Sequence, residues 1–120
     1  MIKDLAGIYP ALPTPMRANG DINVAGLRQL VDFEIAQGVD GLYVGGSTAE
    51  SFLLTEDERK TIAETVLSQA AGKVKVIVHV GAGGTDAAVR LSRHARENGA
   101  DAIGLVFYEP SPRNVQLQQA

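Results

Sequence analysis

The most informative segment of the sequence is GLYVGGSTAESFLLTEDER, residues 41–59. Its first four residues are apolar and end at two glycines, a composition that predicts a short buried strand followed by a turn. Thr55 is followed three residues later by Glu58, which is the spacing of a capping box at the start of a helix. Strand, turn and helix in this order make one β/α unit.

The same alternation extends toward the amino terminus. The segment at residues 7–12 is short and apolar, which predicts a strand. Prolines and a glycine follow it and predict a loop. Asn23 is placed to cap a helix whose apolar residues recur at helical spacing until Gly38.

The alternation also extends toward the carboxyl terminus. The second helix ends at Gly72, and the β-branched run VKVIVHV, residues 74–80, predicts the third strand. Thr85 is a candidate cap for a third helix that Gly99 ends, and residues 102–106 predict a fourth strand. The order is β-α-β-α-β-α-β, which indicates a parallel sheet with helical crossovers.

An internal repeat bears on how this sheet closes. QGVDGL at residues 37–42 resembles NGADAI at 98–103, and the copies begin 61 residues apart with two β/α units between them. Eight units of that size give the roughly 250 residues of a (β/α)8 barrel. Four strands also suit a small doubly wound sheet, but the repeat favours an α/β fold that is the N-terminal half of a (β/α)8 TIM barrel. We expect residues 1–120 to form one partial barrel domain, with an irregular tail at 107–120.

Composition limits the classes of function. The chain has 120 residues, a formal net charge of −3 and no cysteine, which excludes disulfides and Cys-ligated metals. Two histidines are too few for a His-rich metal centre, and the lack of basic surplus argues against nucleic acid. No apolar run approaches the roughly 20 residues that span a bilayer, and the start does not resemble a signal peptide. We therefore expect a cytoplasmic protein with no metal and no membrane partner.

The turn after the second strand is the candidate site. It lies at the carboxyl end of its strand, where parallel α/β folds place their sites. Ser47 and Thr48 supply two hydroxyls, and successive backbone N–H groups could form a nest for a carboxylate or a phosphate. The alternative is a turn in which these hydroxyls bond only to the local backbone. Neither a P-loop nor a Rossmann fingerprint is present, and for residues 81–84 a plain turn is the better interpretation.

Four other polar side chains have simpler interpretations. His79 ends the third strand and is better explained as a packed, hydrogen-bonded histidine than as a catalytic one. His94 lies between two arginines on the third helix, which indicates a solvated face. Packing explains Tyr43, and hydrogen bonds that stabilise the turn explain Glu50.

Residues 41–59 resemble the strand-two signature of the N-acetylneuraminate lyase and dihydrodipicolinate synthase family, the class I pyruvate-dependent aldolases. ALPTP at 11–15, NGDIN at 19–23 and VHVG at 78–81 resemble further family segments in order and spacing. The resemblance runs from residue 5 to residue 106. Gly-Gly-Ser-Thr preceded by Leu-Tyr-Val is closer to the N-acetylneuraminate lyase branch than to the synthase branch, which usually has Gly-Thr-Thr.

The resemblance implies a barrel lysine that forms a Schiff base with pyruvate or another 2-keto acid. It implies that Ser47 and Thr48 bind the keto-acid carboxylate, that Thr48 also belongs to a hydroxyl relay, and that Tyr108 is a further candidate as the fourth-strand aromatic. The expected reaction of the full-length parent is reversible cleavage of N-acetylneuraminate to N-acetylmannosamine and pyruvate. The family implies no cofactor, and it implies a homo-oligomer, a tetramer in full-length members.

Two alternatives stay open beside this reaction. One is a dihydrodipicolinate synthase-like enzyme or another 2-keto acid aldolase. The other, from a different class, is a non-catalytic half-barrel that binds a carboxylate or a partner. Borohydride trapping with pyruvate separates the catalytic class from the binding class.

The sequence departs from the family pattern in three places. Ala49 stands where the family usually has glycine, so its methyl group could crowd the turn. Residues 105–110 lack the proline that the family usually has before its aromatic pair, and this segment is about two residues short. The family's Schiff-base lysine and catalytic tyrosine match positions beyond Ala120, so we expect the chain as given to be inactive and, as a half-barrel with open edges, to self-associate.

The four lysines present do not replace the missing one. A reactive lysine needs a desolvated pocket that lowers its pKa. The sequence offers no such pocket, and each lysine is better explained as a solvated surface residue: Lys3, Lys60, Lys73 and Lys75.

Overall fold

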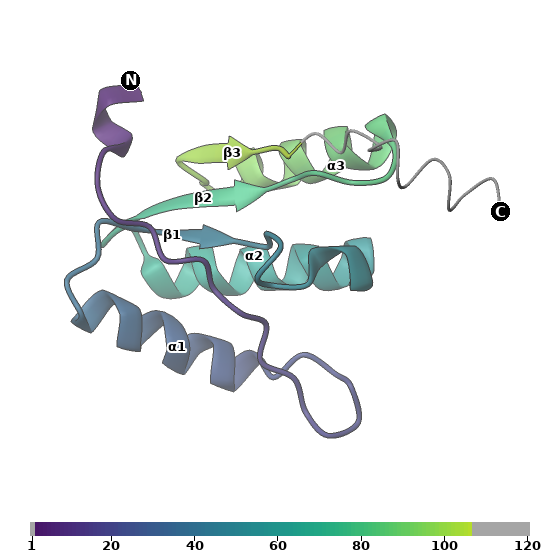
Figure 1. The fold of residues 1–120 in the computed structure, drawn as a ribbon, viewed down its shortest axis with the longest axis horizontal. Helices are drawn as coiled ribbons and strands as arrows, with labels where there is room; N and C mark the ends of the chain where they lie inside the picture. Colours follow the sequence, from purple (N-terminus) through teal and green to yellow (C-terminus); the bar gives the residue numbers. More distant parts are fainter. Residues whose placement is uncertain (1, 107–120) are drawn as a thin grey trace, which may run out of the picture.

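The computed structural model of the chain describes residues 2–106. Helices and strands alternate along it, and Figure 1 shows the three longer helices side by side along the sheet. In chain order the elements are a 3-10 helix η1 (Ile2–Leu5), α1 (Val24–Ala36), β1 (Gly41–Val44), a 3-10 helix η2 (Ser51–Leu53), α2 (Glu56–Ala70), β2 (Lys75–His79), α3 (Thr85–Glu97) and β3 (Ala102–Gly104).

The strands form one parallel sheet in the order β1-β2-β3. Gly41 lies opposite Lys75 in the first pair, and Ile77 lies opposite Ala102 in the second. All three arrows point the same way in Figure 1, so the carboxyl ends of the strands share one edge. Strand order follows chain order without a reversal, as in a barrel and unlike a doubly wound sheet.

The predicted first strand is only partly formed. Residues 8–12 run beside β1, where the Leu12 N–H donates to Tyr43 O at 3.0 Å and the Tyr43 N–H donates to Pro10 O at 3.0 Å. Only a single parallel bridge to Tyr43 results. Pro10 has no N–H to complete the ladder, which explains the missing strand. The segment still occupies the place of a first barrel strand beside β1.

The internal repeat has the same structural role in both copies. Asp40 Oδ2 accepts a hydrogen bond from the Ile8 N–H at 2.7 Å, and Asp101 Oδ2 accepts one from the Val76 N–H at 2.8 Å. The two aspartate N–H groups donate back to Ile8 O and Val76 O at 3.1 and 3.0 Å. Each aspartate therefore connects the start of its own strand to the extended segment that precedes it in the sheet. Ile8 is in this way the counterpart of Val76, which supports the repeating-unit prediction.

The apolar core lies between the sheet and the helices. Alternate strand residues point to the two faces of a sheet, and those of β1 and β2 on the helix side are almost fully buried. They pack against one stripe from each helix, so a single core holds the layers together. The core residues on strands and helices are Leu42, Val44, Val76, Val78, Leu27, Val31, Ile62, Ala63, Val66, Ala70, Leu91 and Ala95.

Two predicted helix caps are confirmed. The Asn23 side chain accepts from the Gly26 N–H at 2.9 Å at the start of α1. At the start of α2, Thr55 Oγ1 accepts from the Glu58 N–H at 3.1 Å, and the Thr55 N–H donates to Glu58 Oε1 at 3.0 Å. Both halves of the predicted capping box are therefore present.

The predicted cap of α3 is wrong by one residue. Thr85 is the first residue of the helix, and Gly84 with its extended backbone takes the cap position without a side-chain hydrogen bond. The fourth strand is also shorter than predicted, since β3 ends at Gly104. Among the described residues β3 pairs with β2 alone, and only three register positions support it.

Polar contacts join α2 to its neighbour α3. Glu56 accepts from two nitrogens of Arg90 at 2.8 and 3.0 Å and also pairs with Lys60 at 3.5 Å. The hydrogen bonds and charge of Arg90, with those of Lys60, lower the pKa of Glu56 to about 2. His94 Nε2 lies 2.7 Å from Glu64 Oε1. The predicted solvated face for His94 is therefore wrong, because its ring contacts Glu64 and so connects α3 to α2.

Part of the apolar surface is open on the β3 side. Ile103 is 51% exposed, and a hollow of about 460 Å³ lies between α3 and β3. In a closed barrel the next β/α unit covers this face. The expected self-association of an open half-barrel stays a prediction.

Tyr108 and the predicted tail at 107–120 lie outside the described residues. Within residues 2–106, no helix combines the length and apolar character needed to cross a bilayer.

The capping box gives a first prediction. Thr55→Ala removes one of the two reciprocal hydrogen bonds and should lower the free energy of unfolding by about 1 kcal/mol. Urea denaturation followed by circular dichroism measures this change. Thr55→Ser, which keeps the hydroxyl, is the matched control and should unfold close to the wild type. Equal loss in both variants would contradict a role for the hydroxyl.

Candidate active site

The predicted turn follows β1 at the carboxyl edge of the sheet. Gly45 has a φ of 73°, a left-handed conformation that glycine adopts without strain, and there the chain leaves the line of the strand. Gly46 O then accepts from the Ala49 N–H at 3.1 Å and from the Ser51 N–H at 3.3 Å. These bonds curl residues 46–51 into a compact turn that leads into η2.

Ser47 and Thr48 lie at the exposed tip of this turn. Ser47 O accepts from the Glu50 N–H at 3.0 Å. Within residues 2–106, neither hydroxyl and neither backbone N–H of Ser47 or Thr48 has a hydrogen-bond partner. The alternative in which the hydroxyls bond to the local backbone is therefore not what the structure has. Four donors at one tip suit an anionic ligand.

Ala49 fits the turn in place of the family's usual glycine. Its side chain is buried at 1% exposure, and its φ is not among the positive values that would strain an alanine. Ala49 O accepts a hydrogen bond from Thr14 Oγ1 at 2.8 Å. The expected crowding by the methyl group is absent, and residues 10–16 help to hold the turn.

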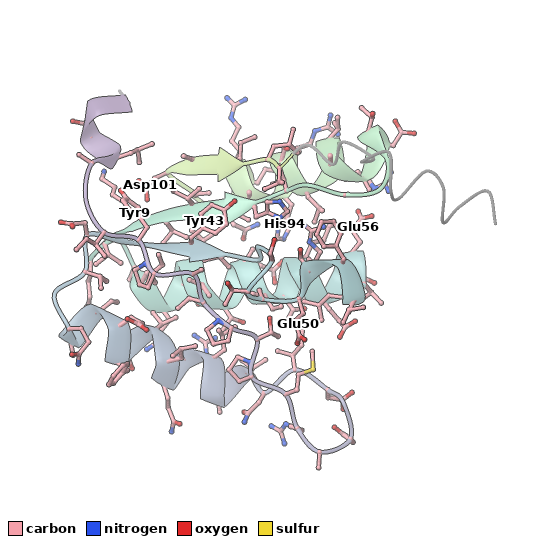
Figure 2. The ribbon with its side chains drawn as sticks, viewed as in Figure 1. Tyr9, Tyr43, Glu50, Glu56, His94 and Asp101 are labelled. Atoms are coloured by element: carbon pink, nitrogen blue, oxygen red, sulfur yellow. The ribbon has the colours of Figure 1, made fainter. Side chains whose placement is uncertain are left out.

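Glu50, and not Ala49, has the strained backbone conformation in this turn. Its φ of 60° and ψ of 38° place a residue other than glycine in the left-handed region. Its side chain makes no capping bond to η2, so the contribution of Glu50 to the turn is the backbone bond to Ser47. Figure 2 places Glu50 beyond the end of β1, and Asp101 toward the opposite end of the sheet.

His79 closes β2 beside the turn and is 2% exposed. Its Nδ1 lies 2.9 Å from Gly45 O, and a carbonyl only accepts, so Nδ1 carries the hydrogen. Burial lowers the pKa of His79, and the nearby charge of Arg59 lowers it further, against the opposing effect of the Gly45 bond. The imidazole is therefore a neutral donor that fastens the turn, which confirms the packed, hydrogen-bonded interpretation.

Arg59 is the residue that sequence reasoning missed. It is 8% exposed, and its Nη1 and Nη2 donate to Gly81 O at 2.6 Å and to His79 O at 3.0 Å. Its position was available in the sequence, because Arg59 lies three residues before Ile62 and four before Ala63 on the buried face of α2. A charged residue at a core position of a helix is a signal that something polar lies opposite.

Tyr43 is a packing residue, as predicted, and its side chain lies on the face of the sheet away from the helices. Its ring lies 6.3 Å from the His79 ring, and its hydroxyl occupies the space that a Cβ at Gly104 would need. Partial burial raises the pKa of its phenol. The Tyr43 ring therefore lies between Gly104 at the end of β3 and Gly46 at the start of the turn.

A hollow of about 870 Å³ lies at the same edge of the sheet. Residues 82–85 of the β2–α3 loop line it together with Phe52, Ala88, Leu105 and Val106. Ser47 and Thr48 are not part of its lining. The structure thus places the predicted hydroxyl pair at the strand ends but outside this hollow.

The described lysine side chains lie away from the turn. Lys75 pairs with Asp101 at 3.6 Å at the amino end of its strand, and Lys60 pairs with Glu56 on α2. Lys73 is exposed in the loop before β2. Their surface interpretation is confirmed, and none of the three supplies a desolvated amine.

The architecture and the turn after β1 are those of a barrel protein. The chain is a run of β/α units of a (β/α)8 barrel with a donor-rich turn at the carboxyl edge, where barrels of this type bind their ligands. The model of the dihydrodipicolinate synthetase family matches residues 4–116. The chain belongs to this family.

Individual relatives agree with this membership. The N-acetylneuraminate lyase of Citrobacter koseri is 46% identical over 112 residues, which cover 92% of this chain and 38% of the relative. The solved N-acetylneuraminate lyase of Mycoplasma synoviae superposes with a TM-score of 0.86 at 31% identity, over 92% of this chain and 39% of that one. The Fusobacterium nucleatum enzyme complexed with pyruvate gives 0.82 at 36%, over 86% and 35%. The chain thus spans less than two fifths of these relatives.

His79 gives the second prediction. Nitrogen-15 NMR of the ring should show the hydrogen on Nδ1 and a bare Nε2 near neutral pH, because Gly45 O can only accept. A hydrogen on Nε2 instead would contradict the proposed bond. His79→Phe removes the titrating ring and is the reference for the pH effect below.

The lowered pKa of His79 also gives a pH dependence with a definite sign. The unfolded chain, with a pKa near 6.5, binds the proton more readily than the folded protein does. The stabilising contribution of neutral His79 is therefore complete above about pH 6.5 and is lost as pH falls through the folded-state pKa. His79→Phe should show a smaller loss in this window. The contribution of Glu56, whose pKa is lowered to about 2, is lost at lower pH, below its usual 4.5.

Proposed function

We propose that this chain supplies the 2-keto acid carboxylate site of a Schiff-base lyase of the N-acetylneuraminate lyase type. The observation that carries the proposal is the exposed pair Ser47 and Thr48, whose hydroxyl and N–H donors are unpartnered within the described residues of a chain from this family. The proposed reaction of the whole protein is reversible cleavage of N-acetylneuraminate to N-acetylmannosamine and pyruvate. The three relatives named above all carry the name of this lyase.

The chemistry of the turn fits a carboxylate. Charged acceptors form short, strong hydrogen bonds with several donors at once, and two hydroxyls with two N–H groups provide them. Holding the carboxylate fixes the position of the adjacent keto carbon relative to an attacking amine, which lowers the entropic part of the barrier. Thr48 would also carry protons in the hydroxyl relay. Tyr108 remains proposed as a further substrate contact.

The proposed assembly is a homo-oligomer in the cytoplasm. A dihydrodipicolinate synthase-like specificity is the alternative within the family, and one of the solved structures similar to this chain is the dihydrodipicolinate synthase of Aquifex aeolicus. An assay for release of pyruvate from N-acetylneuraminate distinguishes the two, because only the first specificity predicts turnover of this substrate.

The third prediction concerns the hydroxyl pair. In the protein expressed from its whole reading frame, Ser47→Ala and Thr48→Val should each raise the dissociation constant for pyruvate by about tenfold to a hundredfold, because each removes a hydrogen bond to a charged group. Isothermal titration calorimetry measures the change. Ser92→Ala is the matched control, since Ser92 Oγ bonds to Ala88 O within α3. Unchanged pyruvate affinity in both turn variants would refute the carboxylate site.

The fourth prediction distinguishes an enzyme from a carboxylate-binding module. A protein whose lysines were all on the surface could bind a carboxylate but could not form the Schiff base. Borohydride reduction in the presence of pyruvate should leave a stable adduct on one lysine of the expressed protein, located by peptide mass spectrometry. The adduct should fall on none of Lys60, Lys73 and Lys75. Pyruvate binding without any adduct would favour the binding module.

A further inference from the structure

The ladder between β1 and β2 ends earlier than β2 does. β1 stops at Val44, which is paired with Val78, and the chain turns away at Gly45. The Val80 N–H donates to Gly104 O of β3, so the carbonyl of the preceding residue His79 faces the opposite side, toward β1. This carbonyl is left without a strand partner at a buried position, which is costly unless another donor replaces the strand.

The guanidinium of Arg59 is that donor. Its two terminal nitrogens reach His79 O and Gly81 O, at 3.0 and 2.6 Å, so one side chain replaces the missing stretch of β1. The backbone of Arg59 is fixed in the first turn of α2, where its N–H donates to Thr55 O at 3.0 Å. Helix α2 is thereby tied directly to the end of β2.

His79 continues this connection to the turn. Its Nδ1 donates to Gly45 O, two residues before Ser47. The ring lies over Gly81, where an added Cβ would come within 2.7 Å of Nε2, so the space for the ring depends on glycine there. A series of buried contacts therefore connects α2, through Arg59 and His79, to Gly45 at the start of the turn that carries Ser47 and Thr48.

On the far side of the turn a second tie is present. Thr14 Oγ1 donates to Ala49 O, so the tip with Ser47 and Thr48 is held between one anchor at Gly45 and one at Ala49. A binding site held in its bound shape loses less conformational entropy when the ligand arrives. The strength of these anchors should therefore appear in ligand affinity.

We propose that Arg59 and His79 are positioning residues that hold the Gly45–Ser47 backbone in the conformation that binds the keto-acid carboxylate. The inference rests on the proposed function, since it concerns the same turn. Neither residue touches the substrate. Arg59 fixes the end of β2 and the His79 backbone, and the imidazole of His79 fixes Gly45.

The test uses substitutions at His79 in the protein expressed from its whole reading frame. His79→Phe keeps the ring shape and removes the donor, and it should raise the pyruvate dissociation constant and KM by about five- to tenfold, with kcat within about twofold. His79→Asn places an amide nitrogen where Nδ1 was and should restore most of the affinity. His94→Phe, on the α2–α3 contact, is the matched control and should leave pyruvate affinity unchanged.

A double-mutant cycle with Ser47→Ala distinguishes positioning from a general structural effect. If His79 acts through the turn, His79→Phe should add little to the loss that Ser47→Ala already causes. Additive losses, or wild-type affinity in His79→Phe while Ser47→Ala binds weakly, would overturn the positioning role and leave the proposed function standing. Wild-type affinity in Ser47→Ala and Thr48→Val would instead refute the proposed function itself.

A second variant keeps the test decisive if His79→Phe does not fold. Thr14→Val removes the other anchor of the turn at nearly constant volume. It should raise the pyruvate dissociation constant about fivefold with little change in kcat, for the same reason. Unchanged affinity in Thr14→Val would overturn the view that anchoring of the turn sets the affinity.

Discussion

The break in the ladder between β1 and β2 at Gly45 is the constraint on which the carboxyl edge of this structure depends. Up to Val44 the two strands satisfy each other's backbone groups. Beyond it, the left-handed Gly45 turns the chain away and leaves a buried carbonyl of β2 unpaired. A buried arginine from α2 donates to this carbonyl, and a neutral histidine from β2 donates to Gly45 O. Both contacts lie at the edge where the hydroxyls of Ser47 and Thr48 are exposed.

This arrangement places fixed and free polar groups side by side. The carbonyls of Gly45 and Ala49 are each satisfied by a side chain from a different segment. Between them, Ser47 and Thr48 keep their donors available toward solvent. A turn that satisfied all of its own hydrogen bonds would have nothing left for a ligand, so the external anchors allow the tip to remain both ordered and available.

The wider fold supports the site through a repeated device. Asp40 and Asp101 each connect the start of a strand to the extended segment that precedes it in the sheet, so successive units are aligned at the amino edge as well. The apolar core on the helix side then packs the strands against the helices.

The order of elements, the parallel sheet, two helix caps and the turn with Ser47 and Thr48 could be predicted from the sequence, because glycines, capping residues and apolar periodicity act locally. The tertiary structure was needed to assign the roles of Arg59, Thr14 and His94, because their partners lie 20 or more residues away along the chain. It also showed the incomplete first strand and the unstrained Ala49. These features depend on which backbone groups meet across the sheet, and local sequence does not encode that meeting.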